Sequence, residues 1–164
     1  MIKESEDMLS QAFELCEDGN YVDALKVYDA VIKKDPKNIN ALLDKAVTLQ
    51  NLGKVNTAIR LYNQALKINP NNLDALLNKG SALHTAEKYS EAIKCYDLAI
   101  GIDRNCAMAI AYKGLSLGEL GNLQEAIAHF KKALTIDQNY ELANISKKLA
   151  QDLLKESKKK SKTL

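Results

Sequence analysis

The most constraining feature of this chain is a pattern that returns every thirty-four residues. Residues 5–38, 39–72, 73–106 and 107–140 align beneath one another without insertion. One column of this alignment is alanine in every block, and another is aromatic in every block: Ala24, Ala58, Ala92 and Ala126, and Tyr28, Tyr62, Tyr96 and Phe130. A unit of this length cannot bury its apolar face alone, so the pattern predicts helical units that stack on one another.

Within each block the apolar spacing is helical and is interrupted once. In the second block Leu42, Ala46 and Leu49 recur at i, i+4 and i+7, which places them on one face of a helix. Gly53 ends that helix and Pro70 ends the next one, because glycine adopts a left-handed conformation easily and proline lacks an N–H. The spacing predicts helices over 5–18 and 22–34, 40–52 and 56–68, 73–86 and 90–102, and 107–120 and 124–136.

Small residues recur where two helix backbones must approach closely. The eighth position of each block holds only alanine or glycine: Ala12, Ala46, Gly80 and Gly114. Large side chains of the aromatic column are expected to fill the space opposite them, which gives a dense core. We therefore interpret the aromatic residues as core residues, and we expect no cofactor.

Composition and motifs exclude several other classes of protein. No apolar run approaches the roughly 20 residues of a membrane-spanning helix, and the first residues lack the apolar segment of a signal peptide. Three cysteines, Cys16, Cys95 and Cys106, have no metal-ligand spacing and are interpreted as reduced thiols of a cytoplasmic protein. Neither a phosphate-binding loop nor a metalloprotease or nucleophile motif is present, so we predict no enzymatic activity and no metal site.

The repeats over residues 5–140 resemble tetratricopeptide repeats. This resemblance implies an all-α fold, a right-handed α-solenoid of four helix–turn–helix repeats in which each first helix lines a concave groove. The third repeat departs from the pattern, because Glu87 stands where the other repeats have a turn glycine and Gly101 lies inside a helix. We expect this repeat to be the loosest.

The remaining segments flank the repeats. Residues 1–4 are an N-terminal extension, residues 141–155 are predicted to form a capping helix, and the lysine-rich tail 156–164 is expected to be disordered. The cap is polar where a partner helix is missing, as a terminal unit should be. Its other side carries a second apolar stripe that points toward the groove in this register: Leu142, Ile145, Leu149 and Leu153.

A peptide-binding groove is predicted from the first-helix positions that share one face. Its candidate residues are mostly apolar with polar groups at the edge: Leu9, Phe13, Leu43, Asp44, Val47, Asp74, Leu77, Asn78, Ser81, His84, Ala111, Tyr112, Leu115, Ile145 and Leu149. In one interpretation they receive an extended or helical segment with apolar anchors and basic flanks. In the other, the leucines are half-buried between neighbouring first helices, and the sequence leaves both open.

A sharper function implied by the resemblance does not fit these residues. Chaperone-binding members of the family hold a C-terminal carboxylate with lysine, arginine and asparagine on groove positions, because a buried carboxylate must be paired. Only Asn78 matches this clamp, while Asp44 and Asp74 would repel the ligand. We therefore expect no chaperone ligand of the dicarboxylate-clamp type.

Lysine and histidine recur without a ligand-binding pattern. The seventh position holds lysine in three repeats and the cap (Lys45, Lys79, Lys113 and Lys147), and we expect each stem to pack between repeats while the ammonium reaches water. His84 and His129 have no cluster of other ligands around them in the sequence. We interpret both as solvated.

Three functions remain for a chain of this kind. The favoured one is a non-enzymatic adaptor whose groove binds a protein or peptide that the sequence does not identify. A self-associating homo-oligomer, in which the apolar stripe of the cap docks into another copy, is the first alternative. The second is a weak tether to nucleic acid or an anionic membrane through the lysine-rich tail, disfavoured because residues 1–154 carry 20 acidic and 18 basic residues.

Overall fold

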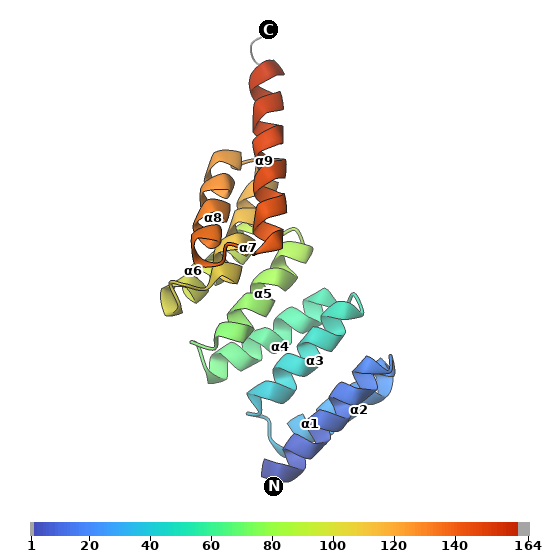
Figure 1. Ribbon diagram of the computed structural model, residues 1–164. Helices are drawn as coiled ribbons and strands as arrows, with labels where there is room; N and C mark the ends of the chain where they lie inside the picture. Colours follow the sequence, from blue (N-terminus) through green and yellow to red (C-terminus); the bar gives the residue numbers. More distant parts are fainter. Residues whose placement is uncertain (1, 161–164) are drawn as a thin grey trace. The chain divides into compact units, whose positions relative to one another are not determined.

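The computed structural model describes residues 2–160, and over that range the chain forms nine α-helices and no strand (Figure 1). Every predicted helix within the four repeats is confirmed, with ends within three residues of the prediction. The helices are α1 (Ile2–Glu17), α2 (Tyr21–Lys34), α3 (Ile39–Asn51), α4 (Val55–Ile68), α5 (Leu73–Thr85), α6 (Tyr89–Ile102), α7 (Ala107–Glu119), α8 (Leu123–Ile136) and α9 (Glu141–Lys160).

The two ends of the chain differ from the prediction. Helix α1 begins at Ile2, so most of the predicted N-terminal extension 1–4 is helical. Helix α9 continues to Lys160, five residues beyond the predicted end of the cap, and corrects the expectation of disorder for 156–160. Lysine and glutamate are good helix formers, and Asp152 and Lys155 add an i, i+3 ion pair at 3.4 Å. The rest of the predicted tail, 161–164, lies outside the described residues.

The chain divides within α5 into two compact units, Met1–Ala82 and Leu83–Leu164, called unit 1 and unit 2 below. The core of unit 1 surrounds Tyr62, where α3 packs against α4. The core of unit 2 surrounds Phe130 and joins α7, α8 and α9. Each unit thus buries the apolar faces of several helices together, as the repeat pattern predicts.

Small and large residues interdigitate in these cores. Tyr28, Tyr62, Tyr96 and Phe130 are each at most 2% exposed, which confirms their interpretation as core residues. Gly114 on α7 lies directly against Phe130 on α8, and a Cβ atom added at Gly114 would lie 2.8 Å from Cε1 of that ring. The space opposite the aromatic column is therefore filled to contact distance.

Two lysines of the seventh-position column connect consecutive repeats. The side chains of Lys45 and Lys113 are only 20% and 17% exposed, so their stems are packed as predicted. Lys45 pairs with Asp29 in unit 1, and Lys113 Nζ lies 2.7 Å from Asp97 Oδ1 in unit 2. Each ammonium therefore meets a carboxylate on the second helix of the preceding repeat, where the prediction had placed water.

The turn after α5 confirms the departure of the third repeat. Glu87 adopts a φ of 59°, in the left-handed region that Gly53 and Gly121 occupy in the equivalent turns of the second and fourth repeats. The backbone closes normally, because Lys88 N donates to Leu83 O at 2.8 Å. A residue with a side chain therefore occupies a position that favours glycine.

We expect the substitution Glu87→Gly to stabilise the protein by about 0.5–1 kcal/mol. Relief of the left-handed conformation gains roughly 1–2 kcal/mol, and the greater freedom of glycine in the unfolded chain offsets part of that gain. Guanidinium unfolding followed by circular dichroism measures the effect. Lys94→Gly, in the exposed interior of α6, is the control and should destabilise by about 1 kcal/mol. An unfolding midpoint for Glu87→Gly below that of wild type would contradict the inference that the backbone at Glu87 is strained.

Candidate interaction groove

A hollow of about 520 Å³ lies on α1 and α3, the first helices of the first and second repeats, in unit 1. Its α1 residues follow one helical face at spacings of three and four, and its α3 residues are four apart. We call this hollow the acidic groove, because its lining contains three carboxylates and neither lysine nor arginine: Glu6, Leu9, Ser10, Phe13, Glu14, Asn40 and Asp44.

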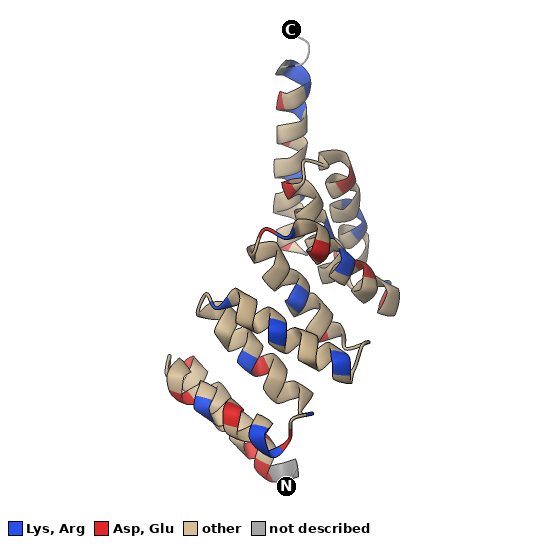
Figure 2. Cartoon of the chain, turned by 180° about the vertical axis from the view of Figure 1, so that it is seen from behind, with Lys and Arg blue, Asp and Glu red and all other residues tan. Residues whose placement is uncertain are grey.

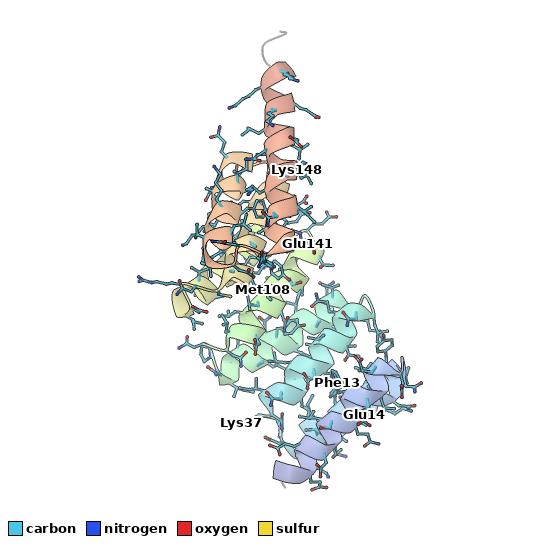
Figure 3. All side chains as sticks on the ribbon, in the orientation of Figure 1. Phe13, Glu14, Lys37, Met108, Glu141 and Lys148 are labelled. Carbon is cyan, nitrogen blue, oxygen red and sulfur yellow. The ribbon has the colours of Figure 1, made fainter. Side chains whose placement is uncertain are left out.

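Two apolar side chains, Leu9 and Phe13, line the acidic groove. Phe13 is 62% exposed, which is unusual for a phenylalanine. Leu9, one turn earlier on α1, is partly buried against the cluster formed by Ala12, Ala24 and Tyr28. Figure 3 labels Phe13 and its neighbour Glu14 on α1. An exposed aromatic ring therefore lies on α1 one turn after a leucine that is packed against the core.

Among the described residues, none supplies a positive charge or a hydrogen bond to the carboxylate of Asp44 in the acidic groove. Asp44 is exposed at the residue level, and no ion pair or side-chain hydrogen bond reaches its carboxylate from the described residues. Partial burial raises the pKa of this carboxyl group above its ordinary value. No positive charge from the described residues therefore offsets the negative charge of Asp44 in the acidic groove.

A second hollow of about 750 Å³ adjoins the acidic groove and shares Glu6, Leu9 and Asn40 with it. Lys34 is the basic residue of this lining, and its Nζ donates to Glu4 Oε1 at 2.7 Å. This hydrogen bond lowers the pKa of Glu4. Because Lys34 is already paired, the second hollow adds no unpaired positive charge to this face of unit 1.

Three predicted groove residues are buried. Leu43 and Leu77 are 8% and 9% exposed, and Ala111 is fully buried. This burial corrects the expectation that they are open to a ligand: Leu43 belongs to the core of unit 1 and Ala111 to the core of unit 2. Leu43 and Leu77 are thus more deeply buried than the half-buried state that the second interpretation described.

The other predicted residues of unit 1 remain at the surface or near it. Leu9, Phe13 and Asp44 come together in the acidic groove, whereas Val47 and Asp74 are exposed outside its lining. Asn78 and Ser81 are half-buried on α5, and Gln50 Nε2 lies 3.5 Å from Ser81 Oγ. The structure thus brings three of the predicted residues into one hollow.

In unit 2, His84 is held between helices and is not freely solvated, which corrects its interpretation. Its Nδ1 lies 2.9 Å from Oγ of the fully buried Ser116, and its ring centroid lies 5.1 Å from that of Tyr89. Burial lowers the pKa of His84. The ring of His84 therefore links the last turn of α5 to α7 within unit 2.

The remaining predicted residues of unit 2 differ in their exposure. Tyr112 is half-buried with its ring centroid 5.8 Å from that of Tyr96, and Leu115 is half-buried in the core of unit 2. Ile145 and Leu149 on α9 are each 60% exposed. The open apolar surface that the sequence predicted for unit 2 is therefore found mainly on α9.

Sequence reasoning missed several residues of the acidic groove. Ser10, Glu14 and Asn40 line it but were not among the candidates. Ser10 and Glu14 continue an i, i+4, i+8 row from Glu6, so extending the face of Leu9 and Phe13 by one helical row would have found these two residues. Asn40 lies on α3, one turn before Asp44.

Neither a metal site nor a membrane-spanning helix is found within the described residues. Over 2–160, no group of three or more histidine, cysteine, aspartate or glutamate side chains is arranged to hold a metal ion. In the same part of the chain, none of the helices has the combined length and apolar character that crossing a membrane requires.

Comparison with protein-family models identifies the repeats. A model described as anaphase-promoting complex, cyclosome, subunit 3 matches residues 17–99, about half of the chain, and the tetratricopeptide repeat model matches residues 107–140. The chain belongs to the tetratricopeptide repeat family. The resemblance seen in the sequence is thereby confirmed. A comparison of this tetratricopeptide repeat protein with curated proteins finds no match.

Solved structures share the fold. A crystal structure of MamA protein aligns with a TM-score of 0.81 at 24% identity, covering 93% of this chain and 83% of that chain. A tetratricopeptide repeat protein from Parabacteroides merdae aligns with a TM-score of 0.80 at 20% identity, covering 91% and 59%. The first tetratricopeptide domain of human RPAP3 aligns with a TM-score of 0.71 at 22% identity, covering 76% and 98%. These likenesses show the α-solenoid fold alone.

Family and fold together define the broad class of function. Tetratricopeptide repeat proteins are scaffolds for protein–protein interaction, and this chain is one of them. Neither the family nor the fold points to catalysis.

Proposed function

We propose that this tetratricopeptide repeat protein is a non-enzymatic adaptor whose acidic groove binds a helical segment with apolar anchors and flanking basic residues. The observation that carries the proposal is the exposed ring of Phe13 among three carboxylates with no basic residue in the lining. Helix-in-groove recognition uses apolar anchors for affinity, and unlike charges around them increase the rate and selectivity of association.

The wider groove of the sequence analysis stays a prediction. Val47 and Asp74 extend the exposed surface of unit 1, and Tyr112 and Leu115 are only half-buried in unit 2. A ligand longer than the acidic groove has room to contact Val47 and Asp74 as well as Phe13. A cytoplasmic location also stays a prediction, and so does the expected absence of a chaperone ligand.

Two synthetic amphipathic peptides test the proposal, one with leucines at i, i+4 and i+8 flanked by lysines and one with glutamates in place of those lysines. Fluorescence anisotropy should show binding of the lysine peptide, weaker at high salt, and no binding of the glutamate peptide. Phe13→Ser should weaken binding by roughly tenfold or more, since truncation of a central anchor costs more than about 1.4 kcal/mol.

Val22→Ser is the matched control for this experiment. Val22 is 69% exposed on α2 in the same unit but does not line the acidic groove. Its substitution should leave binding of the lysine peptide unchanged. Equal losses in the two variants, or preference for the glutamate peptide, would refute binding in the acidic groove.

A further inference from the structure

Helix α9 has two apolar faces, and only one of them is packed within unit 2. Ala143, Ala150 and Leu154 belong to the core of that unit, through contacts of α9 with α7 and α8. On another face, three apolar side chains are 60%, 60% and 45% exposed: Ile145, Leu149 and Leu153, called the α9 stripe below. Because one face of α9 already packs on α7 and α8, the exposed α9 stripe indicates a further partner.

The α9 stripe and the acidic groove have matching periods. Residues of the stripe are four apart, and so are Leu9 and Phe13 on α1. Four residues of α-helix rise about 6 Å, so both surfaces present apolar side chains at the same interval. Rows with this spacing can interdigitate when two helices pack.

Charge is complementary between the two helices that carry these surfaces. Helix α9 contains six lysines and three acidic residues, a net charge of +3. Helix α1 contains one lysine and five acidic residues, a net charge of −4. Figure 2 shows the basic residues gathered toward the C-terminal end of α9. The most basic helix of the chain therefore carries the exposed apolar stripe, and the most acidic one carries Phe13.

Individual charges also lie at comparable intervals. Lys148 and Lys155 are exposed along one edge of the α9 stripe, seven residues or about 10.5 Å apart (Lys148 is labelled in Figure 3). Glu6 and Glu14 in the acidic groove are eight residues or about 12 Å apart. Lys155 also meets Asp152 at 3.4 Å, but an exposed pair of this kind contributes little and can be exchanged.

We propose that the α9 stripe of one copy docks into the acidic groove of a second copy. The inference rests on the proposed function of the acidic groove and names its occupant. The two surfaces are different parts of the chain, so the contact is heterologous: each copy offers one groove and one stripe, and association continues head to tail.

Two one-sided variants test this arrangement in sedimentation velocity over a concentration series. Glu6→Lys/Glu14→Lys reverses the charge of the groove, and Ile145→Ser/Leu149→Ser removes the stripe; all four positions are exposed, so helicity by circular dichroism should be retained. Wild type should form growing oligomers at low salt, and each variant alone should be monomeric. An equal mixture of the two should form dimers and nothing larger, because one intact groove meets one intact stripe.

Other outcomes overturn the proposal. A wild-type protein that stays monomeric at every concentration, including one whose stripe folds onto its own groove, would exclude docking between copies. Oligomers that persist in either variant, or a mixture that stays monomeric, would place the contact elsewhere. Binding of wild type to phosphatidylserine vesicles, lost on removal of the stripe and unaccompanied by oligomers, would assign the stripe to a membrane. Binding of the lysine peptide in any of these cases would preserve the proposed function.

Leu98→Ser is the control for the loss of exposed apolar surface. Leu98 on α6 is 60% exposed, as Ile145 and Leu149 are, but belongs to neither surface. This variant should form the same oligomers as wild type.

Discussion

Replacing Gly114 with alanine is expected to destabilise unit 2 by about 1–3 kcal/mol, the usual cost of overpacking a core. The added Cβ would lie 2.8 Å from Cε1 and 3.0 Å from Cδ1 of Phe130. That ring is only 2% exposed and its neighbours on α7 and α8 surround it, so it has little room to withdraw. Denaturant unfolding followed by circular dichroism measures the loss.

Gly101→Ala is the matched control, with the same chemical change in the neighbouring helix α6. A Cβ at Gly101 meets nothing within 4 Å. Because alanine has a higher helix propensity than glycine, Gly101→Ala should stabilise the protein by up to about 1 kcal/mol. The two substitutions should therefore move the unfolding midpoint in opposite directions. A shift of the same sign in both would show that close packing against Phe130 does not limit the size of residue 114.

Alkaline pH is expected to destabilise the protein strongly, starting near pH 10. Burial raises the pKa of the phenols of Tyr28, Tyr62 and Tyr96, and raises that of Tyr140 to about 12. Folding thus holds these groups neutral while the unfolded chain ionises them at their ordinary pKa of about 10. Stability is therefore fully present below pH 10, and each tyrosine lowers the free energy of unfolding by up to about 1.4 kcal/mol per pH unit above it.

Urea unfolding at a series of pH values from 8 to 12 measures this dependence. Tyr96→Phe keeps the ring and removes the titrating group. Above pH 10 the free energy of unfolding of this variant should therefore fall less steeply than that of wild type, by the contribution of one tyrosine. For Tyr140 the contribution should level off near pH 12, where the folded state also ionises. A stability that does not change between pH 9 and pH 11 would contradict the assignment of these phenols to a water-excluded core.

The fold could be predicted from sequence because its determinants are local and repeated four times. The spacing of Leu42, Ala46 and Leu49 identifies a buried helical face, and residues such as Gly53 and Pro70 mark where helices end. Because the pattern recurs in four blocks, it assigns helices and their ends that a single block would leave ambiguous. The end of α9 was missed because no repeat constrains it, and composition alone did not distinguish a basic helix from a disordered tail.

The site was less predictable because exposure depends on how neighbouring helices cover each face. Leu43 holds the fifth position of the second block and Phe13 the ninth position of the first, and both positions were predicted to face the groove, yet Leu43 is 8% exposed and Phe13 is 62% exposed. Leu43 belongs to the buried core of unit 1, whereas Phe13 lines the acidic groove. The repeat pattern places both residues on the groove face and does not carry this difference in exposure.

NMR mapping of the lysine peptide onto the protein tests the central claim most directly. If the acidic groove is the binding site, amide shifts on titration should concentrate on α1 and α3 around Glu6, Phe13 and Asp44, and α2 should change little. Shifts that map instead to the exposed faces of α2 and α4, or that are absent at saturating peptide, would contradict an interaction scaffold that works through this groove.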